Sequence, residues 1–283
     1  MSEIKDFILH LRLNYNFLIL SAPFLLGALY LPNISNVGLF IYLFLLVYIF
    51  LFGGANAYNS YFDKDEGPIG GLEHPPKMTR WMYYGSWICQ LLGLLLSFLA
   101  LRVFGLLFLF SILMSWLYSG PIFRFKSKPL FSFLIIGIGT GFNATLMGYY
   151  AGGGNEMVPQ LFFGALGVTL MILSMYPFSQ AYQIKEDARR GNITFAVKYG
   201  IQGIKRNYLI LSLLGVLLLS YSFLFNVRLA IGTLLVGLFT SASIWQVVKT
   251  MCGRQDEYHK VMKTKYIGGI SFTIIMLLLL IFL

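Results

Sequence analysis

The sequence predicts an all-α integral membrane protein, for three reasons. Hydrophobic residues make up 58% of the 283 positions and charged residues only 11%, whereas about a quarter of an ordinary soluble domain is charged. The apolar residues form runs close to the length of about 20 residues that a membrane-spanning helix needs. Lys and Arg gather in alternate connections between these runs, which is typical of a multi-pass protein. We therefore expect a single polytopic domain, residues 1–283.

The apolar runs predict nine membrane-spanning helices. They are preceded by the mixed segment 1–14, in the stretch MSEIKDFILHLRLNYNF, which lacks a small-residue cleavage site. We expect this segment to form an amphipathic helix on the membrane surface and to be retained. The spanning segments follow at roughly 15–32, 37–57, 83–101, 103–119, 130–151, 160–180, 207–227, 229–249 and 265–283.

The distribution of Lys and Arg predicts the orientation of these helices. Basic residues in short loops stay on the cytoplasmic side of a membrane. If the N-terminus is cytoplasmic, all 21 basic residues except Arg102 and Arg228 fall on that side. The nine-helix assignment and a cytoplasmic N-terminus therefore support each other, because one missed helix would mix the two sets of loops.

The other composition features narrow the function classes. Cys89 and Cys252 offer neither a disulfide framework nor a CxxC spacing, and the three histidines lack the spacing of zinc ligands. The net charge of +10 follows from the topology and favours contact with anionic membrane lipids. We do not expect a nucleic-acid partner.

Acidic residues are concentrated in two polar loops on the same predicted face, 58–82 and 181–206. Asn59 and Asp63 are spaced i, i+4, as are Gln183 and Asp187, so each pair would project from one face of a helix that continues past the membrane boundary. Such oxygen ligands suit Mg²⁺, which completes its shell with water and substrate phosphates. A solvated loop is the alternative explanation for each single acid. Six of the eleven acidic residues lie in the two loops: Asp63, Asp65, Glu66, Glu73, Glu186 and Asp187.

Two further features of these loops favour a phosphate site over a merely solvated loop. Basic residues are interleaved with the acids, and their side chains can bind phosphate oxygens beside a metal ion. The segment GPIGG, residues 67–71, is a helix-breaking stretch of the kind found in lids. The interleaved basic residues are Lys64, Lys77, Arg80, Lys185, Arg189 and Arg190.

Four segments follow one another in a recognisable order: LRLNYNFLILSAPFLLGALY, NSYFDKDEGPIGG, YSGPIFRFKSKPL and YQIKEDARRGNITFAVKYG. Together they resemble the UbiA superfamily of intramembrane prenyltransferases. The resemblance implies a bundle of nine transmembrane helices around a central cavity. It also implies that two Asp-rich motifs, in cytoplasmic active-site loops, hold a prenyl diphosphate through Mg²⁺.

The sequence departs from the pattern of this superfamily at several motif positions. The first motif keeps Asn59 and Asp63 but has Ser60 and Gly67 where carboxylates are usual, and in the second Ser179 and Gln183 precede the remaining Asp187. The number of metal ions and their exact ligands are therefore open. A terpene cyclase of the same superfamily, which ionises the diphosphate without an acceptor, is an alternative to a prenyltransferase.

The resemblance assigns roles to individual residues. Asp63 and Asp187 are the expected catalytic carboxylates, and with Asn59 they are the first candidates for metal binding. Further candidate ligands are Gln183, Asp65, Glu66 and Glu186. The expected diphosphate ligands are Lys126, Arg124 and Tyr118, followed by Arg12, Lys77 and Arg190.

The prenyl chain, geranylgeranyl or similar, would lie in a dry cavity beside a lipophilic acceptor. Asn143 is an amide in the middle of an apolar run, so it should face the interior of the bundle. It either lines the cavity or joins two helices. A transporter is the alternative from another class, but transporters usually place ionisable groups near the membrane midplane, and none of the acids falls inside an apolar run.

Overall fold

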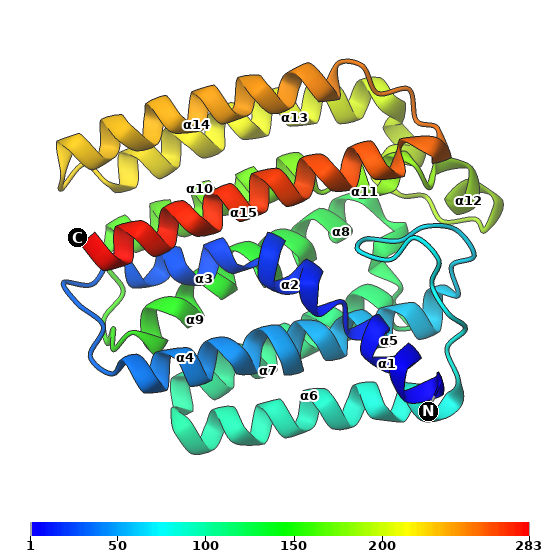
Figure 1. The fold of residues 1–283 in the computed structure, drawn as a ribbon, viewed down its shortest axis with the longest axis horizontal. Helices are drawn as coiled ribbons and strands as arrows, with labels where there is room; N and C mark the ends of the chain where they lie inside the picture. The colour runs from blue at the N-terminus through cyan, green and yellow to red at the C-terminus, as the bar shows by residue number, and fades with distance from the viewer. Residues whose placement is uncertain (1, 283) are drawn as a thin grey trace.

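The computed structural model describes residues 2–282, and about four fifths of the chain is helical. Figure 1 shows the long helices lying side by side along the longest axis of the molecule. Their bounds are α1 Ser2–Leu11, α2 Leu13–Ile19, α3 Ser21–Ala28, α4 Val37–Leu45, α5 Phe52–Asp63, α6 Arg80–Ala100, α7 Arg102–Ser119, α8 Pro129–Ile136, α9 Asn143–Ala151, α10 Pro159–Met175, α11 Phe178–Ala181, α12 Ile184–Arg189, α13 Phe195–Ser222, α14 Val227–Val248 and α15 Tyr258–Phe282.

Two of the long rods contain a π-helical turn. Leu46–Leu51 (η1) joins α4 to α5, and Gly137–Phe142 (η3) joins α8 to α9. Insertions of this type are frequent at functional sites. Both rods contribute to the cavity described below, and the first ends at Asp63.

Eight helical rods in the described part of the chain are long and apolar enough to cross a membrane. The prediction of nine such helices is therefore not confirmed. The first apolar run, 15–32, is divided between α2 and α3. Pro23 has no backbone N–H to donate, and the Leu20 carbonyl at the break accepts from Tyr48 OH at 2.9 Å. Both features favour two short helices over one long one.

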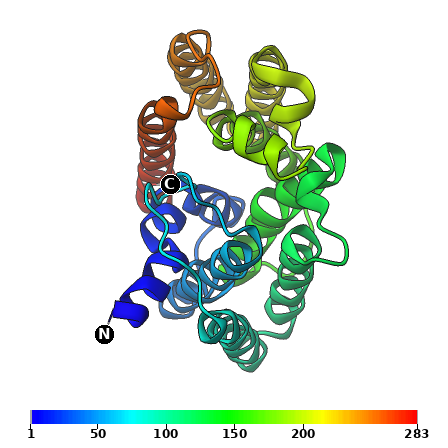
Figure 2. The same cartoon turned by 90° about the vertical axis from the view of Figure 1, so that its right-hand side faces the viewer.

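The helices form a ring when the molecule is viewed from the end that carries the polar loops (Figure 2). On one side of the ring α3 crosses α9 at very short range. A Cβ atom added at Gly27 would lie 2.0 Å from the Thr145 carbonyl oxygen, and one at Gly148 would lie 1.8 Å from that of Phe24. Small residues allow this close backbone approach in membrane helices. Buried aromatic residues, including Phe24, Tyr48 and Phe104, pack around the crossing.

Candidate active site

A cavity of about 960 Å³ opens inside the ring of helices. Most of its wall is apolar, with side chains such as Leu51, Met114, Val168 and Ile275. Most of the polar and charged groups gather at the end of α5, at the start of α12 and in the segment before α8. Those lining the cavity there are Asn59, Asp63, Asp65, Lys126, Gln183 and Asp187. The cavity therefore combines a charged head with a long apolar body.

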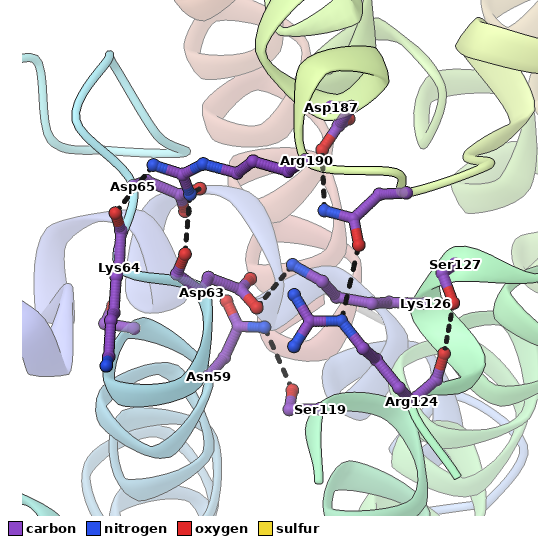
Figure 3. Close-up of polar contacts among 12 residues, drawn as sticks. Asn59, Asp63, Lys64, Asp65, Ser119, Arg124, Lys126, Ser127, Asp187 and Arg190 are labelled. Carbon is purple, nitrogen blue, oxygen red and sulfur yellow. Dashed lines mark hydrogen bonds and ion pairs between the residues drawn. The ribbon is translucent and has the colours of Figure 1, made fainter. Parts of the chain in front are cut away.

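The first motif supplies its side chains from the last turn of α5. Asn59 donates its amide N–H to Ser119 Oγ at 2.9 Å, so its carbonyl oxygen is left as the atom that can accept or ligate. One turn later, the buried Asp63 carboxylate pairs with the ammonium of Lys126, which is also buried. Figure 3 shows Lys126 reaching from its loop toward Asp63 and Asn59. This pair occupies the centre of the charged head.

Local backbone geometry directs the chain at this end of the molecule. Arg12, Lys64 and Arg124 are the three non-glycine residues with positive φ in the described part of the chain, at 50°, 50° and 42°. This conformation is uncommon for residues with a Cβ atom, and such residues cluster at functional sites. Each lies at a helix end beside the cavity head: before α2, after α5 and before the turn Phe125–Ser127 (η2) that carries Lys126.

The second motif is not one continuous helix. The chain leaves the helical path between Tyr182 and Gln183, and α12 begins at Ile184. The Gln183 amide donates to the Pro68 carbonyl at 3.1 Å. Asp187, one turn into α12, accepts from Asn192 at 3.4 Å and from Thr194 at 3.3 Å. The i, i+4 pair of this motif therefore reaches the cavity through a turn and a short helix.

Arg190 joins the two loops, which confirms that they meet. Its guanidinium donates to the carbonyls of Asp63 and Lys64 at 2.5 and 2.7 Å. It also pairs with Asp65 at 3.0 Å and Glu186 at 2.8 Å. Glu186 accepts in turn from the backbone N–H of Glu66 at 3.0 Å. This network makes Arg190 a structural bridge between the motifs.

Burial changes the acidity of the carboxyl groups near the cavity head. It raises the pKa of Asp65 to about 6, and the neighbouring Asp63 adds to the rise while Lys126 and Arg190 oppose it. Burial also raises the pKa of Asp187, again against the effect of Lys126. Carboxylates in such a poorly hydrated site are stabilised by cations. The head is thus suited to a metal ion or to basic side chains.

Several residues singled out from the sequence lie away from the cavity. Lys77 is exposed on the loop that leads to α6, and Glu66 lies at the surface beside Arg189. Arg124 donates to Asn192 at 3.3 Å and does not line the cavity. Asn143 donates to the Leu107 carbonyl and to Ser111 Oγ at 2.8 and 2.7 Å. Of its two possible roles, the structure shows the joining of helices, here α9 and α7.

The remaining diphosphate candidates lie at the cavity wall. Arg12 donates to Ser60 Oγ at 2.7 Å and more weakly to the Gly70 carbonyl at 3.4 Å. Tyr118, at the end of α7, shares a hydrogen bond of 2.9 Å with Tyr176 on the rod of α10. Both Arg12 and Tyr118 line the cavity. The site thus brings together side chains from distant parts of the chain.

Lys265 lies at the cavity head but was not predicted from the sequence as a site residue. Lys265 was counted only among the basic residues of the last loop, but α15 begins at Tyr258 and carries Lys265 two turns into the helix. Its side chain is buried and lines the cavity. The Lys265 ammonium donates to Tyr15 OH at 2.8 Å and to Ser179 Oγ at 2.5 Å. The signal available in the sequence was the position of Lys265, a charged residue at the edge of an apolar run.

Comparisons with known proteins agree with this architecture. A protoheme IX farnesyltransferase from Pyrobaculum arsenaticum is 27% identical over 230 residues, which is 77% of each chain. A UbiA homolog from Archaeoglobus fulgidus, solved with GPP and Mg²⁺, matches with a TM-score of 0.70 at 18% identity and covers 97% of this chain and 99% of its own. A structure described as digeranylgeranylglyceryl phosphate synthase matches with a TM-score of 0.61 at 21% identity, over 97% and 98%.

The fold and the site define a multi-pass helical membrane protein with a charged-headed apolar cavity. The model of the UbiA prenyltransferase family matches residues 20–260. The chain belongs to the UbiA prenyltransferase family, and the resemblance seen in its four sequence segments is confirmed. It is accordingly an enzyme of the prenyltransferase class.

Proposed function

We propose that this enzyme ionises a prenyl diphosphate at the charged head of the cavity and transfers the prenyl group to a lipophilic acceptor within the membrane. The observation that carries the proposal is that the charged side chains lie at one end of the cavity. Asp63, Lys126 and Asp187 lie at one end of a cavity of about 960 Å³ whose wall is otherwise mostly apolar. A diphosphate matches the head and an isoprenoid chain matches the body.

The residues at the head fit one Mg²⁺ ion. Asn59 offers an amide oxygen, Asp63 and Asp187 offer carboxylates, and all three line the cavity. Mg²⁺ is commonly held by one or two carboxylates together with substrate phosphates. Bound there, it would neutralise charge on the departing diphosphate. Asp65 and Gln183 line the cavity close by, whereas Glu66 and Glu186 are engaged at the contact between the loops.

The chain's own residues have three tasks in this reaction. Lys126 donates to a diphosphate oxygen and so exchanges part of its pairing with Asp63 for the substrate. Arg12 and Tyr118 face the same head and orient the anion. The apolar wall excludes water, which would otherwise capture the allylic cation. Electrostatic stabilisation of a leaving group in a dry site is commonly the largest catalytic contribution.

The relatives suggest the class of the donor and acceptor. The Pyrobaculum relative is named for farnesyl transfer to protoheme IX, and the Archaeoglobus homolog was solved with GPP. We infer a donor of the farnesyl to geranylgeranyl class and an acceptor that enters from the lipid.

Product analysis by mass spectrometry tests the proposed reaction. The purified protein in lipid nanodiscs is incubated with geranyl, farnesyl or geranylgeranyl diphosphate, with and without protoheme or a membrane lipid extract. A prenylated product that requires donor, acceptor and Mg²⁺ is expected. A cyclic terpene formed from the donor alone would instead identify a cyclase. If no donor is consumed under any condition, the enzymatic proposal fails and a transporter becomes the better hypothesis.

We also infer that the N-terminus and the charged head face the cytoplasm, because basic residues concentrate at that end. The exposed native Cys252 lies in the loop before α15, and Asn155 is exposed in the loop after α9. In a Cys89→Ser background, an impermeant thiol reagent applied to intact cells should not label Cys252. The variant Asn155→Cys should be labelled, and the reverse pattern would contradict this orientation.

A further inference from the structure

The Lys265 ammonium is a buried cation without a carboxylate partner among residues 2–282. Its hydrogen-bond partners are the hydroxyl groups of Tyr15 and Ser179, and the ammonium also lies 5.2 Å from the centre of the Tyr15 ring. A buried charge is costly unless it is paired. Two neutral hydroxyls solvate the ammonium but do not balance its charge.

The position of Lys265 points to an anion in the cavity. Its partner Ser179 lies on α11, eight positions before Asp187, and Ser179, Asp187 and Lys265 all line the same cavity. Tyr15 links this side of the head to Arg12, because its ring packs against Gly70, whose carbonyl accepts from the Arg12 guanidinium. Two basic side chains therefore face the cavity from α15 and from the start of α2.

The opposite side of the head is built differently. There the Lys126 ammonium already has a carboxylate partner in Asp63. On the second-motif side, Ser179 and Gln183 provide a hydroxyl and an amide, so Asp187 is the only carboxylate of that motif at the cavity wall in the described residues. This donor set is poor for a second divalent cation. The ammonium of Lys265 supplies a positive charge in the same region.

We propose that Lys265 is a diphosphate-binding residue that takes, on the second-motif side of the cavity, the place of a second metal ion. The inference rests on the proposed function, since the anion is the diphosphate of the prenyl donor. An ammonium donates up to three hydrogen bonds, so Lys265 can keep Tyr15 or Ser179 while it binds a phosphate oxygen. The enzyme then needs one divalent cation for each bound diphosphate, held chiefly by Asn59 and Asp63 with Asp187 as the further carboxylate.

Titration of the purified protein with inorganic pyrophosphate in the presence of Mn²⁺ tests this assignment. Calorimetry should give a dissociation constant that rises about tenfold to a hundredfold in Lys265→Met, as expected for loss of a charged hydrogen bond. Lys263→Met, which removes an exposed lysine from the same helix, should bind pyrophosphate like the wild type. Equal affinities of the two variants would overturn the proposal.

Counting the metal ions keeps the test decisive even if Lys265→Met does not fold. Electron paramagnetic resonance of the wild-type protein should detect one tightly bound Mn²⁺ per pyrophosphate, and two would overturn the proposal. In the double variant Lys265→Met with Ser179→Asp, the count should rise to two. Formation of prenylated product by the wild type is a separate readout. If product forms while the Lys265 prediction fails, only this inference is lost.

Discussion

The two sides of the cavity head use similar side chains in opposite ways. On the first-motif side, the buried Lys126 faces a buried carboxylate, Asp63, and the pair neutralises itself. On the second-motif side, the buried Lys265 has hydroxyl groups as its only hydrogen-bond partners within residues 2–282. Both lysines line the same cavity. Lys126 can therefore exchange its carboxylate partner for a substrate, whereas Lys265 has no carboxylate partner among the described residues.

This asymmetry gives each side a different task toward a diphosphate. The first side carries the carboxylate and amide oxygens that suit a divalent cation, whereas the second side carries positive charge of its own. Substitution of the carboxylates should therefore slow metal-dependent chemistry, most of all at Asp63, whereas substitution of Lys265 should mainly weaken anion binding.

Asp63→Asn should lower the rate of prenyl transfer by between two and three orders of magnitude, the range found when a major electrostatic stabiliser is removed. The substitution removes the central carboxylate of the metal site and leaves Lys126 without its partner. Mass spectrometry of product formed under saturating donor gives the rate. Asp256→Asn, at an exposed acid in the last loop, serves as the control and should keep wild-type turnover. Normal turnover of Asp63→Asn would refute its role.

Asp187→Asn should cost about two orders of magnitude in the same assay. The expected loss is smaller because the proposed metal ion is held chiefly by Asn59 and Asp63 on the first-motif side. Thr194 and Asn192 hold the Asp187 side chain in place and can also bond to an amide. A loss larger than that of Asp63→Asn would reverse the comparison between the two sides.

Arg190→Gln should break the bridge between the sides. It removes the pairs with Asp65 and Glu186 and the bonds to the Asp63 and Lys64 carbonyls. Loss of charged hydrogen bonds of this kind lowers stability by about 1.5–3 kcal/mol. We expect the loop 64–79 to be cut about tenfold faster by a protease, with a smaller loss of activity than for either Asp variant. Arg189→Gln, at an exposed neighbour, is the matched control, and unchanged cleavage would contradict the bridging role.

Asn143→Ala should have the smallest effect on the reaction, because this amide joins α9 to α7 and lies outside the cavity head. Hydrogen bonds between membrane helices contribute about 0.6 kcal/mol on average and up to about 1.7 kcal/mol. A lower melting temperature with an unchanged KM for the donor is expected. A raised KM at wild-type stability would instead place Asn143 in the substrate site.

The sequence was sufficient to predict the membrane class and two polar loops on one face, and the family resemblance implied the central cavity. Hydropathy detects only the apolar part of a helix, so it placed the end of the second span at residue 57, although α5 continues to Asp63. The same limitation hid the division of the first run at Leu20. The i, i+4 spacing correctly predicted that Asn59 and Asp63 lie on one face of a helix. The same spacing did not predict the break at Gln183, just before α12.

The contribution of α15 to the head depends on tertiary packing that no local pattern reveals. Lys265 is more than 80 positions from Ser179 and 250 positions from Tyr15, yet it bonds to both. The tally of basic residues that predicted orientation treated Lys265 as a loop residue, and a single lysine at the edge of an apolar run is ordinarily an interface residue. Only the packing of the ring of helices shows that it faces the cavity.

A structure of the protein with Mn²⁺ and a non-ionisable thiolo analogue of farnesyl diphosphate tests the asymmetry of the two sides most directly. Anomalous scattering counts and places the metal ions, and the phosphate oxygens show which lysines they contact. We predict one Mn²⁺ beside Asn59 and Asp63, and a phosphate oxygen within hydrogen-bond distance of Lys265 Nζ. Two Mn²⁺ ions, with Lys265 still bonded only to Tyr15 and Ser179, would contradict it.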